Sequence, residues 1–174
     1  ASMIGAEPIT DDTFLEFRKI FPDDDMLRTL TLLALSEIVA ATNYAGCSRS
    51  AKDPGLSALF AQVAADEIQH MEYFISFAKA LVDSGAYPVK NTVSVIYLFL
   101  RDGGELYGSD RSKVEARTSH VNWWDHIEGT GEVGKPQAFE KQQALILNAL
   151  RRITGLSVNH ATDIEALWME LVGC

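Results

Sequence analysis

The sequence predicts an all-α protein, an up-and-down helical bundle with two long antiparallel helices and shorter C-terminal helices. Apolar residues recur every three to four positions over long stretches, as on the buried face of a helix. No run shows the alternation of β-branched residues that is typical of strands. The prolines fall where the periodic pattern breaks, at positions 8, 22, 54, 88 and 136. The length of 174 residues suits a single domain.

The first half of the chain contains the two long helices. Residues 1–23 are predicted to form an N-terminal arm with a short helix over 12–20. Acidic residues precede the first long helix, expected over 24–51, where they would cap its N-terminus. Asp53-Pro54-Gly55 predicts a tight turn, and the second long helix is expected over 56–83. At 1.5 Å per residue this helix pair would be about 40 Å long.

Supporting helices are predicted over 88–172. Pro88 opens an apolar segment, and the glycine-rich stretch 128–136 is expected to be a loop. The remaining helices are expected over 111–127, 137–154 and 159–172.

Composition and charge exclude several classes of protein. The 47% hydrophobic content excludes disorder over most of the length, and the net charge of −9 argues against binding to nucleic acid or to an anionic membrane. Two cysteines suggest neither a disulfide framework nor a zinc site. With no signal peptide and no apolar run long enough for a membrane span, we expect a cytoplasmic protein.

Three ionisable residues interrupt the stripes that the periodicity assigns to the core. Glu37 lies on the stripe of the first long helix, and Glu67 and His70 lie on that of the second, among Leu59, Phe77 and other apolar residues. An unpaired buried charge costs several kcal/mol, whereas a whole domain is stable by only about 5–15 kcal/mol. A divalent cation would compensate the two carboxylates and accept the neutral imidazole as a ligand.

The spacing places these residues together. Glu67 and His70 are one helical turn apart, and Glu37 and Glu67 lie at similar distances from the turn at Asp53. Glu-x-x-His on facing helices is the ligand pattern of di-iron and di-manganese carboxylate bundles. A salt bridge between His70 and one glutamate is the alternative. Tyr44, two turns after Glu37, is expected to pack near the site with its hydroxyl hydrogen-bonded there.

The segments from Leu35 to Pro54 and from Val63 to His70 resemble the ferritin-like superfamily, and within it the soluble acyl-carrier-protein desaturases. The resemblance implies that Glu37 and His70 are terminal ligands and that Glu67 bridges two iron ions, with manganese as the alternative. It also implies that Asp66 accepts a hydrogen bond from the ring N–H of a histidine across the site.

Two departures from this family affect the expected chemistry. Desaturases carry the ligand set twice in each chain, whereas this segment resembles only their second copy. They also place a threonine three residues after the first glutamate, where this chain has Ala40. The usual dioxygen chemistry is therefore an open question.

The missing ligands have several sources that the sequence leaves open. A twofold homodimer would supply four carboxylates and two histidines, and a partner chain carrying the first ligand set would satisfy the same count. A single metal could instead be held by the three residues alone. Candidate ligands elsewhere in the chain are Glu105, Glu115, His120, His126, Glu140, Gln142, Gln143, His160 and Asp163.

The expected function is a desaturase-like or oxygenase-like oxidoreductase that acts on an apolar or acyl small molecule. An iron-binding or ferroxidase storage-type protein is the alternative, as is a degenerate non-catalytic ferritin-like subunit. The sequence identifies neither the substrate nor the electron donor.

Overall fold

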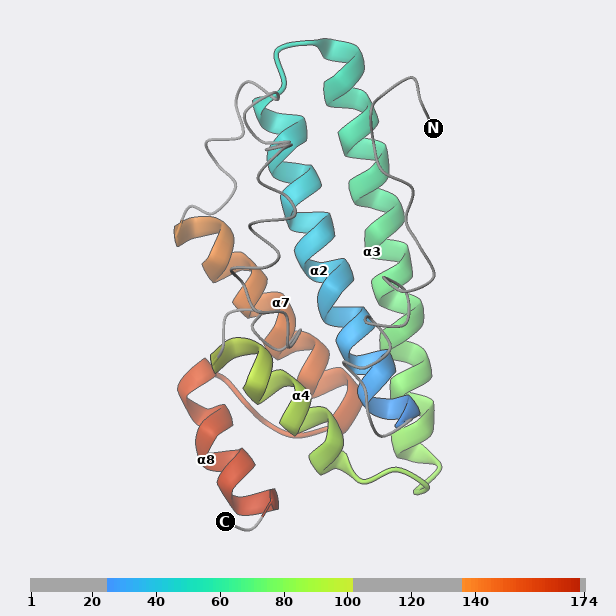
Figure 1. The fold of residues 1–174 in the computed structure, drawn as a ribbon, viewed down its shortest axis with the longest axis vertical. Coiled ribbons are helices and arrows are strands. Elements are labelled where there is room, and N and C mark those ends of the chain that lie inside the picture. The colour runs from blue at the N-terminus through green and yellow to red at the C-terminus, as the bar shows by residue number, and fades with distance from the viewer. Residues whose placement is uncertain (1–24, 102–135, 173–174) are drawn as a thin grey trace, which may run out of the picture.

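The computed structural model describes residues 25–101 and 136–172, and within these ranges the protein is entirely helical. Figure 1 shows the long helices α2 (Met26–Ser50) and α3 (Pro54–Asp83) as an antiparallel hairpin, accompanied by three shorter helices. These are α4 (Val89–Arg101), α7 (Pro136–Thr154) and α8 (Ala161–Val172). The prediction of an all-α protein is confirmed for this part of the chain.

Local chemistry at the ends of the hairpin helices explains their limits. The Asp25 carboxylate accepts a hydrogen bond from the Arg28 backbone N–H at 2.8 Å and caps α2. Asp53 caps α3 in the same way, at 2.7 Å from the Leu56 nitrogen, and Pro54 occupies the first turn, where a missing N–H costs nothing. The turn between the helices is therefore built from residues that favour helix starts.

The predicted helix limits agree with the structure to within two residues where the two can be compared. The pair expected over 24–51 and 56–83 is found as α2 and α3, and the helices expected over 137–154 and 159–172 are found as α7 and α8. The N-terminal arm, the helix over 111–127 and the loop predicted over 128–136 lie outside the described residues, except that Pro136 is the first residue of α7 and so does not belong to the loop.

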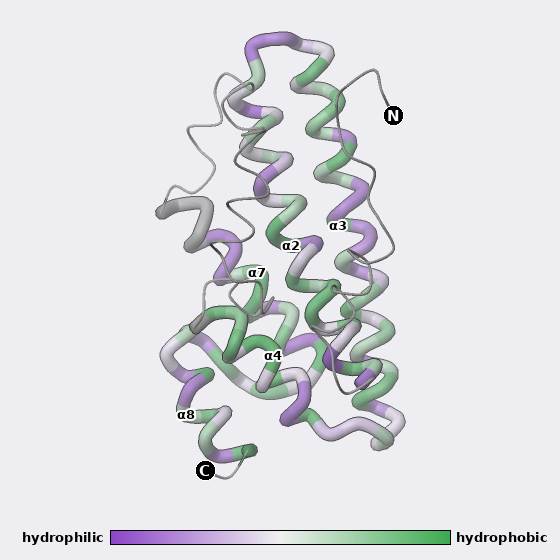
Figure 2. The backbone as a smooth tube through the Cα atoms, in the orientation of Figure 1, coloured by the Kyte–Doolittle hydropathy of each residue, from purple (hydrophilic) through white to green (hydrophobic). Residues whose placement is uncertain are grey.

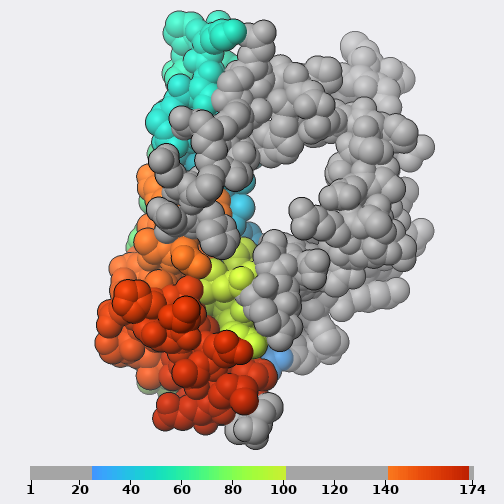
Figure 3. All heavy atoms as spheres, turned by 90° about the vertical axis from the view of Figure 1, so that its left-hand side faces the viewer, coloured from blue at the N-terminus to red at the C-terminus, as the bar shows by residue number. Residues whose placement is uncertain are grey.

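The shorter helices pack at the end of the hairpin opposite the turn. Helix α7 contacts both α2 and α3, and α4 contacts α2, α7 and α8. Figure 2 shows hydrophobic segments gathered where α4 and α7 meet the hairpin, and Figure 3 shows α7 and α8 covering this end of the molecule. Fully buried side chains define the core there: Leu27, Leu35, Ile38, Val93, Ile96, Ile146, Leu150, Ile153 and Ile164.

One side of α3 is less buried than its sequence pattern predicts. Leu59 and Phe77 were expected in the core, but they are 57% and 58% exposed, so this prediction is wrong. The buried residues of α3 follow a neighbouring stripe: Ala64, Met71, Ile75 and Ala78. The apolar periodicity of α3 spans a wider arc than α2 and α7 cover.

Helix α2 is the one described helix whose length and composition would allow it to cross a membrane. Of its most apolar window, 44% is buried inside the protein, and the core helix of a soluble protein passes the same test. The absence of a membrane span and the cytoplasmic location therefore stay predictions.

Candidate metal centre

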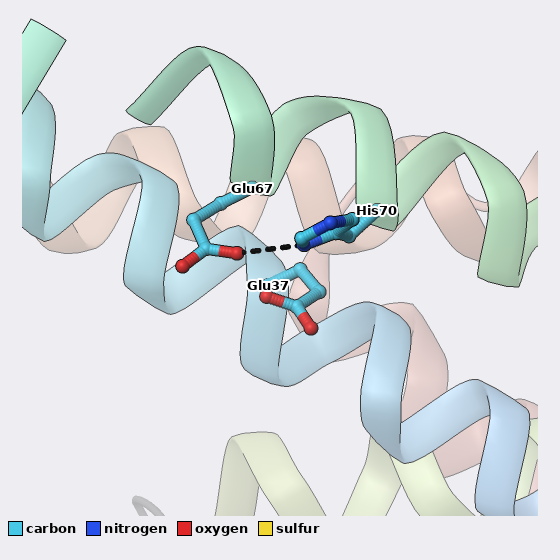
Figure 4. Close-up of side chains that lie close together, drawn as sticks. All are labelled: Glu37, Glu67 and His70. Carbon is cyan, nitrogen blue, oxygen red and sulfur yellow. Dashed lines mark hydrogen bonds and ion pairs between the residues drawn. The ribbon is translucent and has the colours of Figure 1, made fainter. Parts of the chain in front are cut away.

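The two hairpin helices bring together the three residues that the sequence singled out. Glu37 comes from the middle of α2, and Glu67 and His70 come from successive turns of α3. One ligand atom from each residue can be chosen so that all three lie within 4.8 Å of one another. Figure 4 shows the side chains converging between the two helices. We call these three residues the triad.

Glu67 lies at the centre of the contacts within the triad. Its Oε2 atom is 3.0 Å from Nδ1 of His70, one turn further along α3. Its carboxyl group also faces that of Glu37 across the hairpin, with a ligand oxygen of each residue within 4.8 Å of the other. Two carboxylates and one ring nitrogen are all acceptors when unprotonated, so a proton or a cation must lie between them for this arrangement to be favourable.

The electrostatics of Glu37 reflect this crowding. Desolvation by burial raises the pKa of its carboxyl group, and the hydrogen bond with Glu67 and the charge of Glu67 raise it further. His70 acts in the opposite direction and lowers the pKa. A positive charge is thus favourable here and a second negative charge is not.

The triad lies at the surface of the hairpin. Glu37 is half-buried, the Glu67 side chain is 20% exposed and that of His70 is 54% exposed. The prediction of a buried position is therefore wrong for His70 and holds only in part for the glutamates. The reason is the same as for Leu59 and Phe77: this side of α3 lies outside the arc that α2 and α7 cover. Ions in solution can reach the imidazole directly.

The two other predicted site residues, Tyr44 and Asp66, lie on the same two helices as the triad. Tyr44 is half-buried and its ring stacks on Phe60 of α3, with ring centroids 6.1 Å apart. Asp66 is exposed and accepts a hydrogen bond from Nε2 of Gln62 at 3.0 Å. This contact joins the two helices about two turns from the triad, toward the hairpin turn, and the hydrogen bond expected between the Tyr44 hydroxyl and the site stays a prediction. The role expected for Asp66 involves a histidine beyond the triad and stays a prediction.

Among the described residues, the histidine and carboxylate candidates elsewhere in the chain do not join the group. Nε2 of Gln142 on α7 donates to the Thr42 hydroxyl at 2.7 Å, so this amide links α7 to α2. His160 and Asp163 meet at the start of α8, where the carboxylate accepts from the His160 backbone N–H at 2.9 Å. Glu105, Glu115, His120 and His126 lie outside the described residues, as does the side chain of Glu140.

Sequence reasoning missed an ion pair that holds α3 against α7. Arg152 donates two hydrogen bonds to the Glu72 carboxylate, at 2.7 and 2.5 Å. The paired guanidinium lowers the pKa of Glu72. Glu72 follows His70 by two residues, so this pair fixes α3 close to the triad. No sequence signal links two residues so far apart in the chain.

Comparisons with known proteins give no assignment. No protein-family model matches this chain, and no curated protein or solved structure shows significant similarity to it.

Proposed function

We propose that this protein is a metal-dependent oxidoreductase, built on a ferritin-like helical scaffold, whose metal centre is held by Glu37, Glu67 and His70. The observation that carries this proposal is the convergence of three ligand atoms from two helices within 4.8 Å. Carboxylate and imidazole ligands without a thiolate favour iron or manganese over a closed zinc site. We propose two iron ions, with manganese as the alternative.

The contacts within the triad suggest a role for each residue. Glu67 hydrogen-bonds with His70 and lies within 4.8 Å of Glu37, which suits a bridging carboxylate, with Glu37 and His70 as terminal ligands. The metal ions, when bound, would supply the redox chemistry with dioxygen. We propose an apolar or acyl small molecule as the substrate of this oxidoreductase.

A second function is favoured by the exposure of the site. The His70 side chain is 54% exposed, so a hydrated ferrous ion would reach the triad without passing through an apolar channel. This suits an iron-binding protein that oxidises the metal itself and needs no organic substrate. The two functions share the triad and differ in whether oxidation of iron is the end of the reaction.

Metal binding tests both functions. Protein freed of metal would be titrated with Fe(II) without oxygen and, separately, with Mn(II), while unbound metal is measured by a competing chelator. We expect binding that His70→Ala and Glu67→Gln remove. His160→Ala is the matched control because His160 is exposed and lies outside the triad. Equal binding by His70→Ala and the parent protein would contradict the proposal.

Exposure of the iron-loaded protein to dioxygen separates the two functions. An iron-oxidising protein would consume oxygen in proportion to added Fe(II). An oxidoreductase would need an electron donor and an apolar substrate for sustained turnover. An ordinary salt bridge between His70 and Glu67 would give neither metal binding nor oxygen consumption, and that outcome would reject both functions.

A further inference from the structure

Large apolar side chains are exposed on both sides of the triad. Leu33 precedes Glu37 by one turn, and Leu59 and Phe77 lie eleven residues before and seven residues after His70, so each shares the side of its helix with a triad member. We call the surface formed by the triad and these side chains the hairpin face. Its exposed apolar members are Leu33 at 38%, Leu59 at 57% and Phe77 at 58%.

An apolar surface of this kind marks an interaction site. The paired helices offer a face about 40 Å long and about 20 Å wide. That is enough for the roughly 800 Å² that each partner buries in a stable protein interface. Charged and imidazole groups at the centre of such a surface must find partners when it is covered.

The three candidate ligands at the centre of the hairpin face are half the number that a site for two metal ions uses in helical bundles. The described residues of one chain bring together two carboxylates and one imidazole. Sites for two divalent metals in helical bundles use four carboxylates and two imidazoles. Two copies related by a twofold axis through the triad would supply this number, because such an axis joins the same patch of both copies.

We infer that the hairpin face binds a second copy of this chain, and that divalent metal ions are required for the two copies to associate. This inference rests on the proposed metal site. Four carboxylates brought together carry four negative charges, which would oppose association. Two divalent cations neutralise them, so apolar contact between Leu33, Leu59, Phe77 and their counterparts can then hold the dimer together. Metal and partner would therefore bind cooperatively.

Sedimentation velocity on the full chain tests this inference, with Mn(II) as the probe. At low micromolar concentration we expect a monomer of 19.2 kDa in chelator and a species of twice that mass with Mn(II). One Mn(II) per chain should be bound. Its electron paramagnetic resonance spectrum should show two coupled ions in place of isolated ones.

Variants on the hairpin face separate the partner from the metal. Phe77→Glu and Leu59→Glu change exposed side chains that are not ligands, and we expect each to lose about tenfold or more in dimer affinity. The affinity for Mn(II) should fall together with the dimer affinity. Met169→Glu on α8, also exposed at 45%, is the matched control and should dimerise like the parent protein.

The outcomes distinguish this inference from the proposed function. A chain that binds Mn(II) tightly as a monomer, with Phe77→Glu unchanged, would overturn the dimer and leave the metal site standing. Ligands from elsewhere in the same chain would give that result. A dimer that forms equally well in chelator would overturn the requirement for metal. A chain that binds no metal at all would reject the proposed function first.

Discussion

Glu37→Gln should change stability in opposite directions in the absence and in the presence of metal. The substitution keeps the shape of the side chain and removes its charge. In metal-free protein it removes a carboxylate that burial and Glu67 both disfavour as an anion. In metal-loaded protein it removes a ligand.

The structure sets the size of both effects. At 4.8 Å, the upper limit for the spacing of the triad's ligand atoms, two unit charges repel by about 0.9 kcal/mol in water and by about 3.5 kcal/mol at an effective dielectric constant of about 20. Because the site is partly exposed, water weakens this repulsion, and we expect metal-free Glu37→Gln to be more stable than the parent protein by about 1 kcal/mol. A ligand at a hundred times its Kd stabilises the native state by about 2.7 kcal/mol, and the variant should lose most of this.

Thermal unfolding in chelator and in excess Mn(II) measures both effects. For a domain of this size 1 kcal/mol corresponds to about 2–4 °C in Tm. The parent protein should therefore gain about 5–10 °C on adding Mn(II), and Glu37→Gln should gain little. Glu165→Gln, an exposed position on α8, controls for the change in net charge.

Two results would refute this reasoning. Loss of more than about 1 kcal/mol by Glu37→Gln in chelator would mean that the protein already satisfies this carboxylate without a cation. An equal rise in Tm with Mn(II) in both proteins would mean that Glu37 is not a ligand.

Three further predictions concern the scaffold, and urea unfolding measures each. Asp25→Ala should lower the free energy of unfolding by about 1–2 kcal/mol, because it removes the cap of α2 and the acceptor of a 2.5 Å hydrogen bond from Asn91. An unchanged free energy of unfolding would mean that water replaces both interactions. A double-mutant cycle on Glu72 and Arg152 should give a coupling energy of only about 0.5–1 kcal/mol, because the two side chains are 44% and 37% exposed. A coupling energy of zero would mean that the ion pair does not stabilise the fold. Gly155→Ala should lower the free energy of unfolding by about 1 kcal/mol, because φ is +73° at this residue and an alanine is strained there. The added Cβ would meet no atom within 4 Å, so a gain in stability would show that this backbone strain is absent.

The hairpin could be predicted from sequence because its signals are local. Asp53 and Pro54 start α3 with groups that act within one turn, and Gly85, with φ of +72°, follows the end of α3. The proximity of the three triad residues could also be predicted, because the rise per residue of a helix is constant. Counting residues from the turn is then equivalent to measuring depth along the hairpin.

The sequence could not specify which apolar stripe is covered. Leu59 and Phe77 follow the helical period as well as Met71 and Ala78 do, but only the second pair is buried. Periodicity shows that a stripe is apolar and leaves open which element contacts it. The contacts between α7 and the hairpin could not be predicted for a similar reason, because they depend on how α7 lies against α2 and α3. Examples are the hydrogen bonds of Arg152 with Glu72 and of Gln142 with Thr42.

All the donors of the triad lie between residues 37 and 70, on two helices joined by one short turn. A gene segment that encodes this one stretch of chain therefore encodes all three donors and the hairpin that sets their relative positions. Tandem duplication of the stretch would put two sets into one polypeptide. The same unit could therefore serve a symmetric assembly or a longer chain without any change to its local chemistry.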